Sequence, residues 1–248
     1  MLGNLAEIDY REMTLIQAET LPRVLAGSDV LARAKTGSGK TAAFGLGVLN
    51  KLQTDAFRVQ ALVLCPTREL ADQVAREIRR LARSLPNIKI LTLCGGAPMG
   101  GQLASLQHSP HIIVGTPGRV LKHLGKGTVD LANLQTLVLD EADRMLDMGF
   151  SDELDAILKF VPAKRQTLLF SATYPDAIAA ISNKVQRDAI IIDVTDDEQA
   201  AHITQYWCEV TRENRCADLL GTIRKWGGTL NLVFCNTKID CADVAVYL

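Results

Sequence analysis

A short turn between a strand-like run and an apolar helix constrains this chain more than any other feature. The run covers residues 29–33, the turn reads Ala-Lys-Thr-Gly-Ser-Gly-Lys-Thr at residues 34–41, and the helix is expected over residues 42–52. Gly37 and Gly39 allow a tight turn that points several backbone N–H groups inward. Because a helix N-terminus follows at once, the pattern predicts a loop that binds phosphate.

Two polar side chains at the end of this turn extend the prediction to a nucleoside triphosphate with its magnesium ion. Lys40 is expected to reach the β- and γ-phosphates, and Thr41 to supply a hydroxyl ligand to Mg²⁺. Ala34 stands where the general phosphate-loop pattern has its first glycine, so a surface turn without function is the alternative. The predicted cofactor-binding residues of the loop are Ala34, Lys35, Thr36, Gly37, Ser38, Gly39, Lys40 and Thr41.

Short apolar runs alternate with helical stretches along most of the chain. In the clearest helix, residues 69–85, apolar side chains recur at spacings of three and four. Nearly continuous apolar runs are typical of strands covered on both faces, and strands that alternate with helices form parallel sheets through right-handed crossovers. We therefore predict an α/β fold with strands at residues 29–33, 59–65, 88–93, 111–114, 134–139, 166–170 and 190–194.

Carboxylates follow one of these buried strands directly. Asp-Glu-Ala-Asp occupies residues 140–143, at the carboxyl end of the strand predicted for 134–139. Buried carboxylates are costly unless their charge is used. In a protein with a phosphate loop, Asp140 would hold Mg²⁺ and Glu141 would orient and polarise the attacking water. An acidic helix N-terminus is the alternative.

Further motifs make the chain similar to DEAD-box RNA helicases. Residues 140–143 spell the motif that names this family, and Gln17 with Tyr10 resembles its Q motif. The other motifs follow in the family's order: AKTGSGKT at 34–41 (motif I), PTREL at 66–70 (Ia), GG at 95–96, TPGR at 116–119 (Ib), SAT at 171–173 (III) and VFCNT at 233–237 (IV). The resemblance covers nearly the whole chain.

For the nucleotide, the resemblance implies a catalytic group of Lys40, Asp140 and Glu141, with Thr41 and Asp140 as magnesium ligands. It also implies that the Gln17 amide recognises adenine, since an amide offers a donor and an acceptor, while Tyr10 stacks on the base. An exposed helix residue is the alternative for Gln17.

For RNA, the resemblance implies contacts to the sugar–phosphate backbone that do not read sequence. The residues implied are Pro66, Thr67, Arg68, Gly95, Gly96, Thr116, Gly118 and Arg119. The resemblance also implies coupling between the nucleotide state and RNA binding, through Asp143, Ser171 and Thr173. Buried hydroxyls that satisfy a strand end are the alternative for Ser171 and Thr173.

The resemblance also implies the domain organisation. Residues 1–195 are expected to form a RecA-like P-loop domain with a mostly parallel sheet flanked by helices, followed by a linker at 196–204. Residues 205–248 are expected to be the truncated start of a second RecA-like domain, with strands at 205–210 and 230–235 and helices at 213–226 and from 239. The family's motifs V and VI would lie beyond residue 248, so we expect little ATP turnover by these residues alone.

Composition adds weaker constraints. The net charge of −1 provides no overall positive field for nucleic acid. The six cysteines form no CxxC pair and are expected to be buried and reduced. Acidic side chains interleave with Arg76, Arg79, Arg80 and Arg83, so this helix face is expected to be solvated. Without a signal-like segment or a long apolar run, we expect a cytoplasmic protein that does not span a membrane.

The sequence thus predicts an ATP-dependent RNA helicase that uses ATP and Mg²⁺ and acts on RNA, with ribosomal RNA a candidate substrate of the longer parent protein. Two alternatives stay open at this stage. One is a non-hydrolysing module that binds adenine nucleotide or RNA, and the other is a DNA-directed P-loop translocase.

Overall fold

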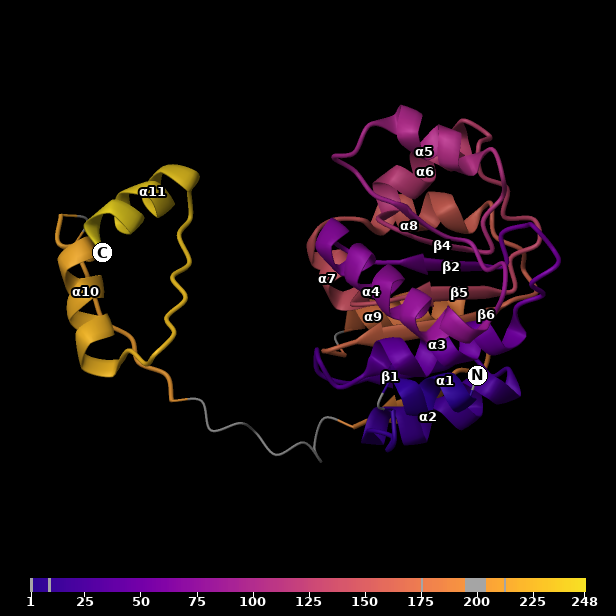
Figure 1. The fold of residues 1–248 in the computed structure, drawn as a ribbon, viewed down its shortest axis with the longest axis horizontal. Helices are drawn as coiled ribbons and strands as arrows, with labels where there is room; N and C mark the ends of the chain where they lie inside the picture. Colours follow the sequence, from indigo (N-terminus) through magenta and orange to yellow (C-terminus); the bar gives the residue numbers. More distant parts are fainter. Residues whose placement is uncertain (1, 9, 175, 195–203, 212) are drawn as a thin grey trace. The chain divides into compact units, whose positions relative to one another are not determined.

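The chain is divided into two compact units, residues 1–198 and 199–248. The computed structural model describes residues 2–8, 10–174, 176–194, 204–211 and 213–248 (Figure 1). Apart from Thr204, the linker predicted at 196–204 lies outside the described residues. The domain limits predicted at residues 195 and 205 stay predictions.

The first unit is built on one seven-stranded sheet whose order is β3-β4-β2-β5-β6-β1-β7. All six pairings between neighbouring strands are parallel. The α/β fold with a parallel sheet is therefore confirmed, and all seven strands predicted between residues 29 and 194 are present. The strands are β1 (Val30–Arg33), β2 (Ala61–Leu64), β3 (Ile90–Leu93), β4 (Ile112–Gly115), β5 (Thr136–Leu139), β6 (Gln166–Ser171) and β7 (Ile190–Asp193).

Helices cover both faces of this sheet (Figure 1). One face packs against α1 (Leu2–Glu7), α2 (Leu15–Ala26), α3 (Lys40–Lys51) and α4 (Arg68–Leu81), the last of which continues into the 3₁₀ turn η1 (Ala82–Ser84). The other face packs against α6 (Pro117–Gly125), α7 (Ala142–Asp147), α8 (Ser151–Leu158) and α9 (Asp176–Val185). A further helix, α5 (Met99–Leu106), follows β3.

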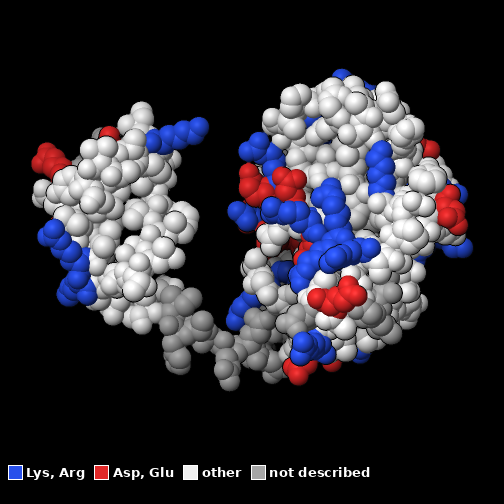
Figure 2. All heavy atoms as spheres, viewed as in Figure 1, with Lys and Arg blue, Asp and Glu red and all other residues white. Residues whose placement is uncertain are grey.

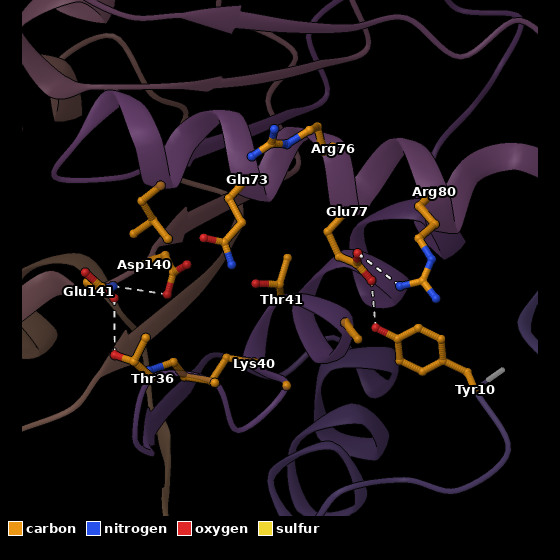
Figure 3. A pocket seen from close by; sticks show the side chains of 14 residues that line it. Tyr10, Thr36, Lys40, Thr41, Gln73, Arg76, Glu77, Arg80, Asp140 and Glu141 are labelled. Carbon is orange, nitrogen blue, oxygen red and sulfur yellow. Dashed lines mark hydrogen bonds and ion pairs between the residues drawn. The ribbon is translucent and has the colours of Figure 1, made fainter. Parts of the chain in front are cut away.

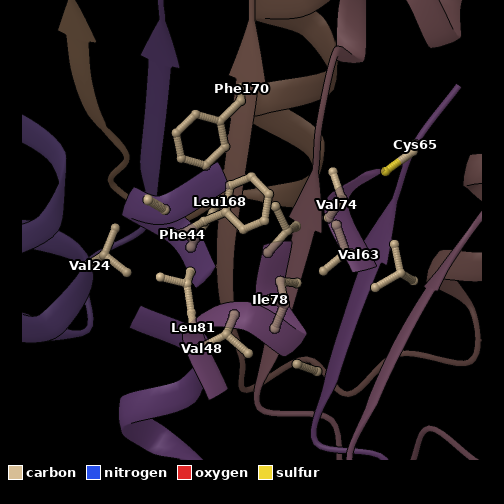
Figure 4. Close-up of a cluster of buried hydrophobic side chains, with 14 of the residues drawn as sticks. Val24, Phe44, Val48, Val63, Cys65, Val74, Ile78, Leu81, Leu168 and Phe170 are labelled. Carbon is tan, nitrogen blue, oxygen red and sulfur yellow. The ribbon is translucent and has the colours of Figure 1, made fainter. Parts of the chain in front are cut away.

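The core beneath α3 and α4 positions the loop that precedes α3 (Figure 4). Phe44 of α3 is fully buried, and its ring lies 5.2 Å from that of Phe170 in β6. Gly47, one turn further along α3, lets Val24 of α2 approach closely, because a Cβ atom there would lie 2.2 Å from a Val24 methyl group. This packing fixes α3 against the sheet, and with it the helix N-terminus.

Burial decreases from the middle of the sheet to its edges. All residues of β2, β4, β5 and β6 are buried, as their continuous apolar sequences predict. The edge strand β7 has only Ile192 buried among its four residues.

The second unit contains helices α10 (Arg215–Trp226) and α11 (Lys238–Tyr247), close to the two predicted helices. The strands predicted at 205–210 and 230–235 are wrong, since no strand occurs among the described residues 204–211 and 213–248. Strands form through hydrogen bonds to a neighbouring strand, which an apolar run alone cannot provide. None of these described residues is buried, and Phe234 is 87% exposed.

The cysteine prediction holds for only part of the chain. Cys65 and Cys94 are buried, as expected, whereas Cys208 and Cys241 are exposed and Cys216 and Cys235 are partly exposed. The reason is that all four of the latter belong to the second unit, whose described residues enclose no core.

We predict that Phe44→Ala destabilises the first unit by about 3–5 kcal/mol, because it leaves a cavity in a closely packed core. The matched control Phe234→Ala, at an exposed site, should change stability by less than about 0.5 kcal/mol. Denaturant unfolding of the two variants, followed by circular dichroism, measures both values. Equal effects of the two substitutions would contradict the assignment of the core.

Candidate nucleotide and RNA site

The candidate site residues lie at one edge of the sheet because its strands are all parallel. The phosphate loop follows β1, the acidic motif follows β5, and residues 171–173 span the end of β6. These three strands are neighbours in the order β5-β6-β1. The predicted RNA motifs follow β3, β4 and β2, which are neighbours on the other half of the sheet. One edge therefore carries two adjoining groups of candidate residues.

The loop at residues 34–41 adopts the tight turn that its glycines allow. Gly37 and Gly39 have φ angles of 86° and 96°, a region that residues with a Cβ atom rarely adopt. At Gly39, a Cβ atom would also lie 2.5 Å from the Gln17 amide nitrogen. Thr36 and Lys35 are exposed, while Ala34 is buried and is anchored to β6 by the bond from its N–H to the Ser171 carbonyl (3.1 Å).

Lys40 begins α3 and is buried beneath the loop. Its Nζ atom donates a hydrogen bond to the carbonyl of Ala34 at 2.8 Å, so the ammonium group is held across the turn. Thr41 follows at the N-terminus of the helix, where the helix dipole favours an anion. Both residues line the same cavity as the acidic motif.

Asp140 and Glu141 are both buried at the end of β5. Burial raises the pKa of Asp140 to about 6, against the lowering effect of Lys40. Glu141 adopts a left-handed backbone conformation (φ 52°), and its carboxylate accepts a hydrogen bond from the Thr36 hydroxyl at 3.3 Å. Its other oxygen lies 3.3 Å from Arg144 Nη1. The left-handed turn thus brings the second carboxylate to the phosphate loop (Figure 3).

Asp143 connects the acidic motif to the end of β6. Its Oδ2 atom accepts three hydrogen bonds, from Ala172 N (3.2 Å), Thr173 N (2.9 Å) and Thr173 Oγ1 (2.8 Å). Burial would raise the pKa of Asp143, but hydrogen bonds to its carboxylate, those from Thr173 foremost, together outweigh burial and lower the pKa. The Ser171 hydroxyl is buried and has no hydrogen-bond partner within 3.5 Å among the described residues.

Gln17 is buried, which excludes the exposed-helix alternative. Its amide oxygen accepts from Thr14 N (3.0 Å) at the start of α2, and its amide nitrogen donates to the Gly39 carbonyl (3.2 Å). A side-chain amide has a second N–H and a second lone pair, so a donor and an acceptor are left for a base. The structure thus ties Gln17 directly to the phosphate loop.

Tyr10 lines the outer part of the cavity. Its hydroxyl donates to Glu77 Oε1 at 2.7 Å, and the Arg80 guanidinium lies 5.4 Å from the centre of its ring. Burial and the Glu77 carboxylate raise the pKa of Tyr10 to about 12. The phenol is therefore neutral at physiological pH.

A cavity of about 400 Å³ is lined by Tyr10, by residues of the phosphate loop and by Asp140 and Glu141, whereas Gln17 and Asp143 do not line it. Five of its lining residues come from α4 and were missed as site residues: Leu70, Gln73, Arg76, Glu77 and Arg80. Figure 3 labels the last four. The basic helix face that contains Arg76 and Arg80 is exposed, as expected for a solvated face, with acidic side chains beside it (Figure 2). Helical periodicity indicates which residues share a face, but it does not identify the element opposite that face.

On the other half of the edge, motif Ia follows β2. Pro66 is buried, and Thr67 caps α4 by accepting a hydrogen bond from Leu70 N at 3.2 Å. Arg68 is exposed and packs over Gly96, where a Cβ atom would lie 2.1 Å from its Nη1 atom. A side chain at residue 96 would displace the flexible Arg68 guanidinium, and the φ angle of 80° would strain it.

The loops after β3 and β4 meet beside Arg68. Gly95 and Gly96 follow β3, and Thr116, Gly118 and Arg119 begin α6 after β4. Arg119 reaches across to the preceding loop and donates to the Ala97 carbonyl at 3.0 Å. A hollow of about 380 Å³ contains Arg68, Gly95 and Gly96 in its lining.

Comparison with known proteins now identifies the class. The family model described as "DEAD/DEAH box helicase" matches residues 14–181, more than half of the chain. The chain therefore belongs to this helicase family.

Two curated relatives are similar in sequence to this chain over most of its length. It is 59% identical over 98% of its length to "ATP-dependent RNA helicase DbpA" of Escherichia coli K12, and covers 53% of that protein. It is 41% identical over 95% of its length to "DEAD-box ATP-dependent RNA helicase CshA" of Geobacillus kaustophilus, and covers 50% of it. The chain thus spans about half the length of these curated relatives.

Solved structures support the RecA-like fold. A DEAD box protein from the hyperthermophile Methanococcus jannaschii aligns over 99% of this chain and 66% of its own, with a TM-score of 0.75 and 36% identity. A hypothetical ATP-dependent RNA helicase from Sulfolobus tokodaii aligns over 78% of this chain and 56% of its own, with a TM-score of 0.71 and 36% identity. Within the described residues, no helix has the length and apolar character needed to cross a membrane.

We predict that Asp140→Asn stabilises the chain at neutral pH by about 1–3 kcal/mol, because a raised pKa means that the folded state disfavours the charged carboxylate. Wild-type stability should fall as pH rises from 3.8 through about 6, and the gain from the substitution should vanish at the acidic end of this range. Thermal unfolding of both proteins across that range tests this.

Asp143→Asn is the matched control within the same motif. Because hydrogen bonds lower the pKa of Asp143, its charged form stabilises the fold, and the substitution should destabilise the chain at neutral pH. Shifts of the same sign in the two variants would contradict the assigned environments.

Proposed function

We propose that this protein is an ATP-dependent RNA helicase, in which RNA-stimulated ATP hydrolysis drives local unwinding of RNA duplexes. One observation carries the proposal: the phosphate loop and the carboxylates Asp140 and Glu141 line one cavity. The candidate RNA motifs lie on the same sheet edge. Membership of the helicase family supports the same assignment.

The residues present fit a magnesium ion bound together with ATP. Asp140 and Thr41 line the cavity, and a magnesium ion is commonly held by one or two protein oxygens plus phosphate oxygens. The bound ion would neutralise phosphate charge.

The protein's own groups would then act as follows. Lys40, held across the loop at Ala34, would turn to the β- and γ-phosphates, while the N-terminal N–H groups of α3 bind phosphate oxygens. The Glu141 carboxylate, which is oriented by its hydrogen bond from Thr36, would accept a proton from the attacking water. Tyr10, which lines the cavity, and Gln17, which is bonded to the loop at Gly39, would recognise the adenine base.

The RNA backbone would lie over Arg68, the loop at Gly95 and Gly96, and the start of α6. Exposed N–H groups and arginines bind phosphate without reading bases, so we propose binding that does not depend on sequence. Asp143 and Thr173 would couple the nucleotide state to RNA binding. Their hydrogen bonds join the acidic motif to the end of β6, both on the nucleotide half of the edge.

We further propose that the parent protein acts on RNA in the cytoplasm, with ribosomal RNA as a candidate substrate. The 248 residues, which span about half of the curated relatives, should bind nucleotide but hydrolyse it slowly by themselves, because closure of two domains on ATP and RNA would complete the catalytic site. The proposed assay therefore uses a protein of the length of the relatives.

In that longer protein, Glu141→Gln should reduce RNA-stimulated ATP hydrolysis at least about 100-fold, because a positioned general base contributes that much. The amide retains an acceptor for Thr36, so nucleotide affinity should stay within about twofold. Steady-state phosphate release and binding of a fluorescent ADP measure the two quantities.

Glu19→Gln serves as the control. Glu19 is exposed on α2 and pairs only weakly with Arg23 at 3.7 Å, so this substitution should leave hydrolysis unchanged. If the wild-type protein binds nucleotide and RNA without hydrolysing ATP, a non-hydrolysing binding module replaces the proposed enzyme.

A further inference from the structure

A buried glutamine joins the two loops assigned to RNA. Gln102 lies in α5, outside every motif recognised in the sequence, and is 8% exposed. Its amide nitrogen donates to the Cys94 carbonyl at 3.0 Å, and its amide oxygen accepts from Arg119 Nη1 at 2.8 Å. Arg119 also donates to the Ala97 carbonyl, so the same cluster holds both ends of the segment 94–97.

A histidine completes this cluster from α6. His123 is fully buried, and its Nε2 atom lies 3.0 Å from the Gln102 amide oxygen. Because that oxygen only accepts, Nε2 must carry the proton, and Nδ1 faces the Thr128 hydroxyl at 2.9 Å. Burial, with the positive charges of Arg119 and Lys126, lowers the pKa of His123, so the ring is neutral.

The arrangement leaves one orientation for the Gln102 amide. If the oxygen and nitrogen were exchanged, an amide N–H would face the Arg119 guanidinium, which only donates, and the oxygen would face the Cys94 carbonyl, which only accepts. A buried polar group without a partner costs about 1–3 kcal/mol, so the observed orientation is strongly preferred.

We propose that Gln102 is a positioning residue for RNA binding, which fixes the Gly95–Gly96 loop and the Arg119 guanidinium relative to one another as one backbone-binding surface. This inference rests on the proposed RNA function. Gly95 and Gly96 have no side chains of their own to hold their N–H groups in place. The neighbouring contacts at Cys94 and Ala97 supply that constraint, and both depend on the Gln102–Arg119 pair.

The test compares three variants with the wild type, in a protein of the length of the relatives. Gln102→Leu removes all the polar contacts, and Gln102→Glu keeps acceptors for Arg119 and His123 but places an oxygen against the Cys94 carbonyl. Gln107→Leu, at an exposed position just after α5, is the control. Fluorescence anisotropy of a labelled short oligouridylate, with a non-hydrolysable ATP analogue present, measures RNA affinity.

We expect Gln102→Leu to weaken RNA binding about tenfold, the effect of losing one or two hydrogen bonds. Binding of a fluorescent ADP and the unfolding midpoint report whether the nucleotide half and the fold persist, and Gln107→Leu should match the wild type throughout. A loss of RNA and ADP affinity in parallel would mean a general structural role and would overturn the inference.

The pH dependence of RNA affinity in Gln102→Glu provides a measurement that a purely structural role would not affect. A protonated carboxyl can donate to the Cys94 carbonyl as the amide does, so the affinity of this variant should approach that of the wild type as pH falls. A constant ratio between the two proteins across pH would overturn the inference. Equal RNA affinity of the wild type and all variants would overturn the inference about Gln102. Failure of the wild type itself to bind oligouridylate would instead overturn the proposed RNA function.

Discussion

Parallel pairing of the strands is the constraint on which the rest of the structure depends. It places every strand-to-helix connection at one sheet edge, so that loops distant in the sequence become neighbours. The order β5-β6-β1 gathers the nucleotide groups, and β3-β4-β2 gathers the candidate RNA groups. Because β2 pairs with β5, the two groups adjoin at the middle of the sheet. Asp143 and Thr173 then add a polar link between neighbouring loops.

The parts of the fold that sequence could predict are those in which local pattern and tertiary environment agree. The central strands are apolar on both faces, and α4 shows clear helical periodicity, so each was recognisable from its own residues. The phosphate loop was recognisable for the same reason, since its glycines are needed by the turn itself. Among the described residues of the second unit, the apolar pattern at 230–235 has no neighbouring strand to pair with, and the same reasoning failed.

The missed site residues have in common that their partners are distant in the sequence. Glu77 meets Tyr10 across 67 positions, and nothing near either residue indicates the contact. Gln102 and His123 are buried polar residues on two helices, and each would be read alone as an ordinary helix residue. Such contacts depend on how helices pack over the sheet edge. Burial with every polar atom paired, rather than sequence pattern, identifies them.

The central claim is that one nucleotide site is formed by the loop at Gly37–Gly39 and the carboxylates at Asp140 and Glu141. Paramagnetic broadening of backbone amide signals by Mn²⁺ with ADP, in place of Mg²⁺, tests it directly. The account predicts that both segments show the strongest broadening together, and that Gly95 and Gly96 are affected less. Strong broadening at only one of the two segments, or centred on the Gly95–Gly96 loop, would contradict it.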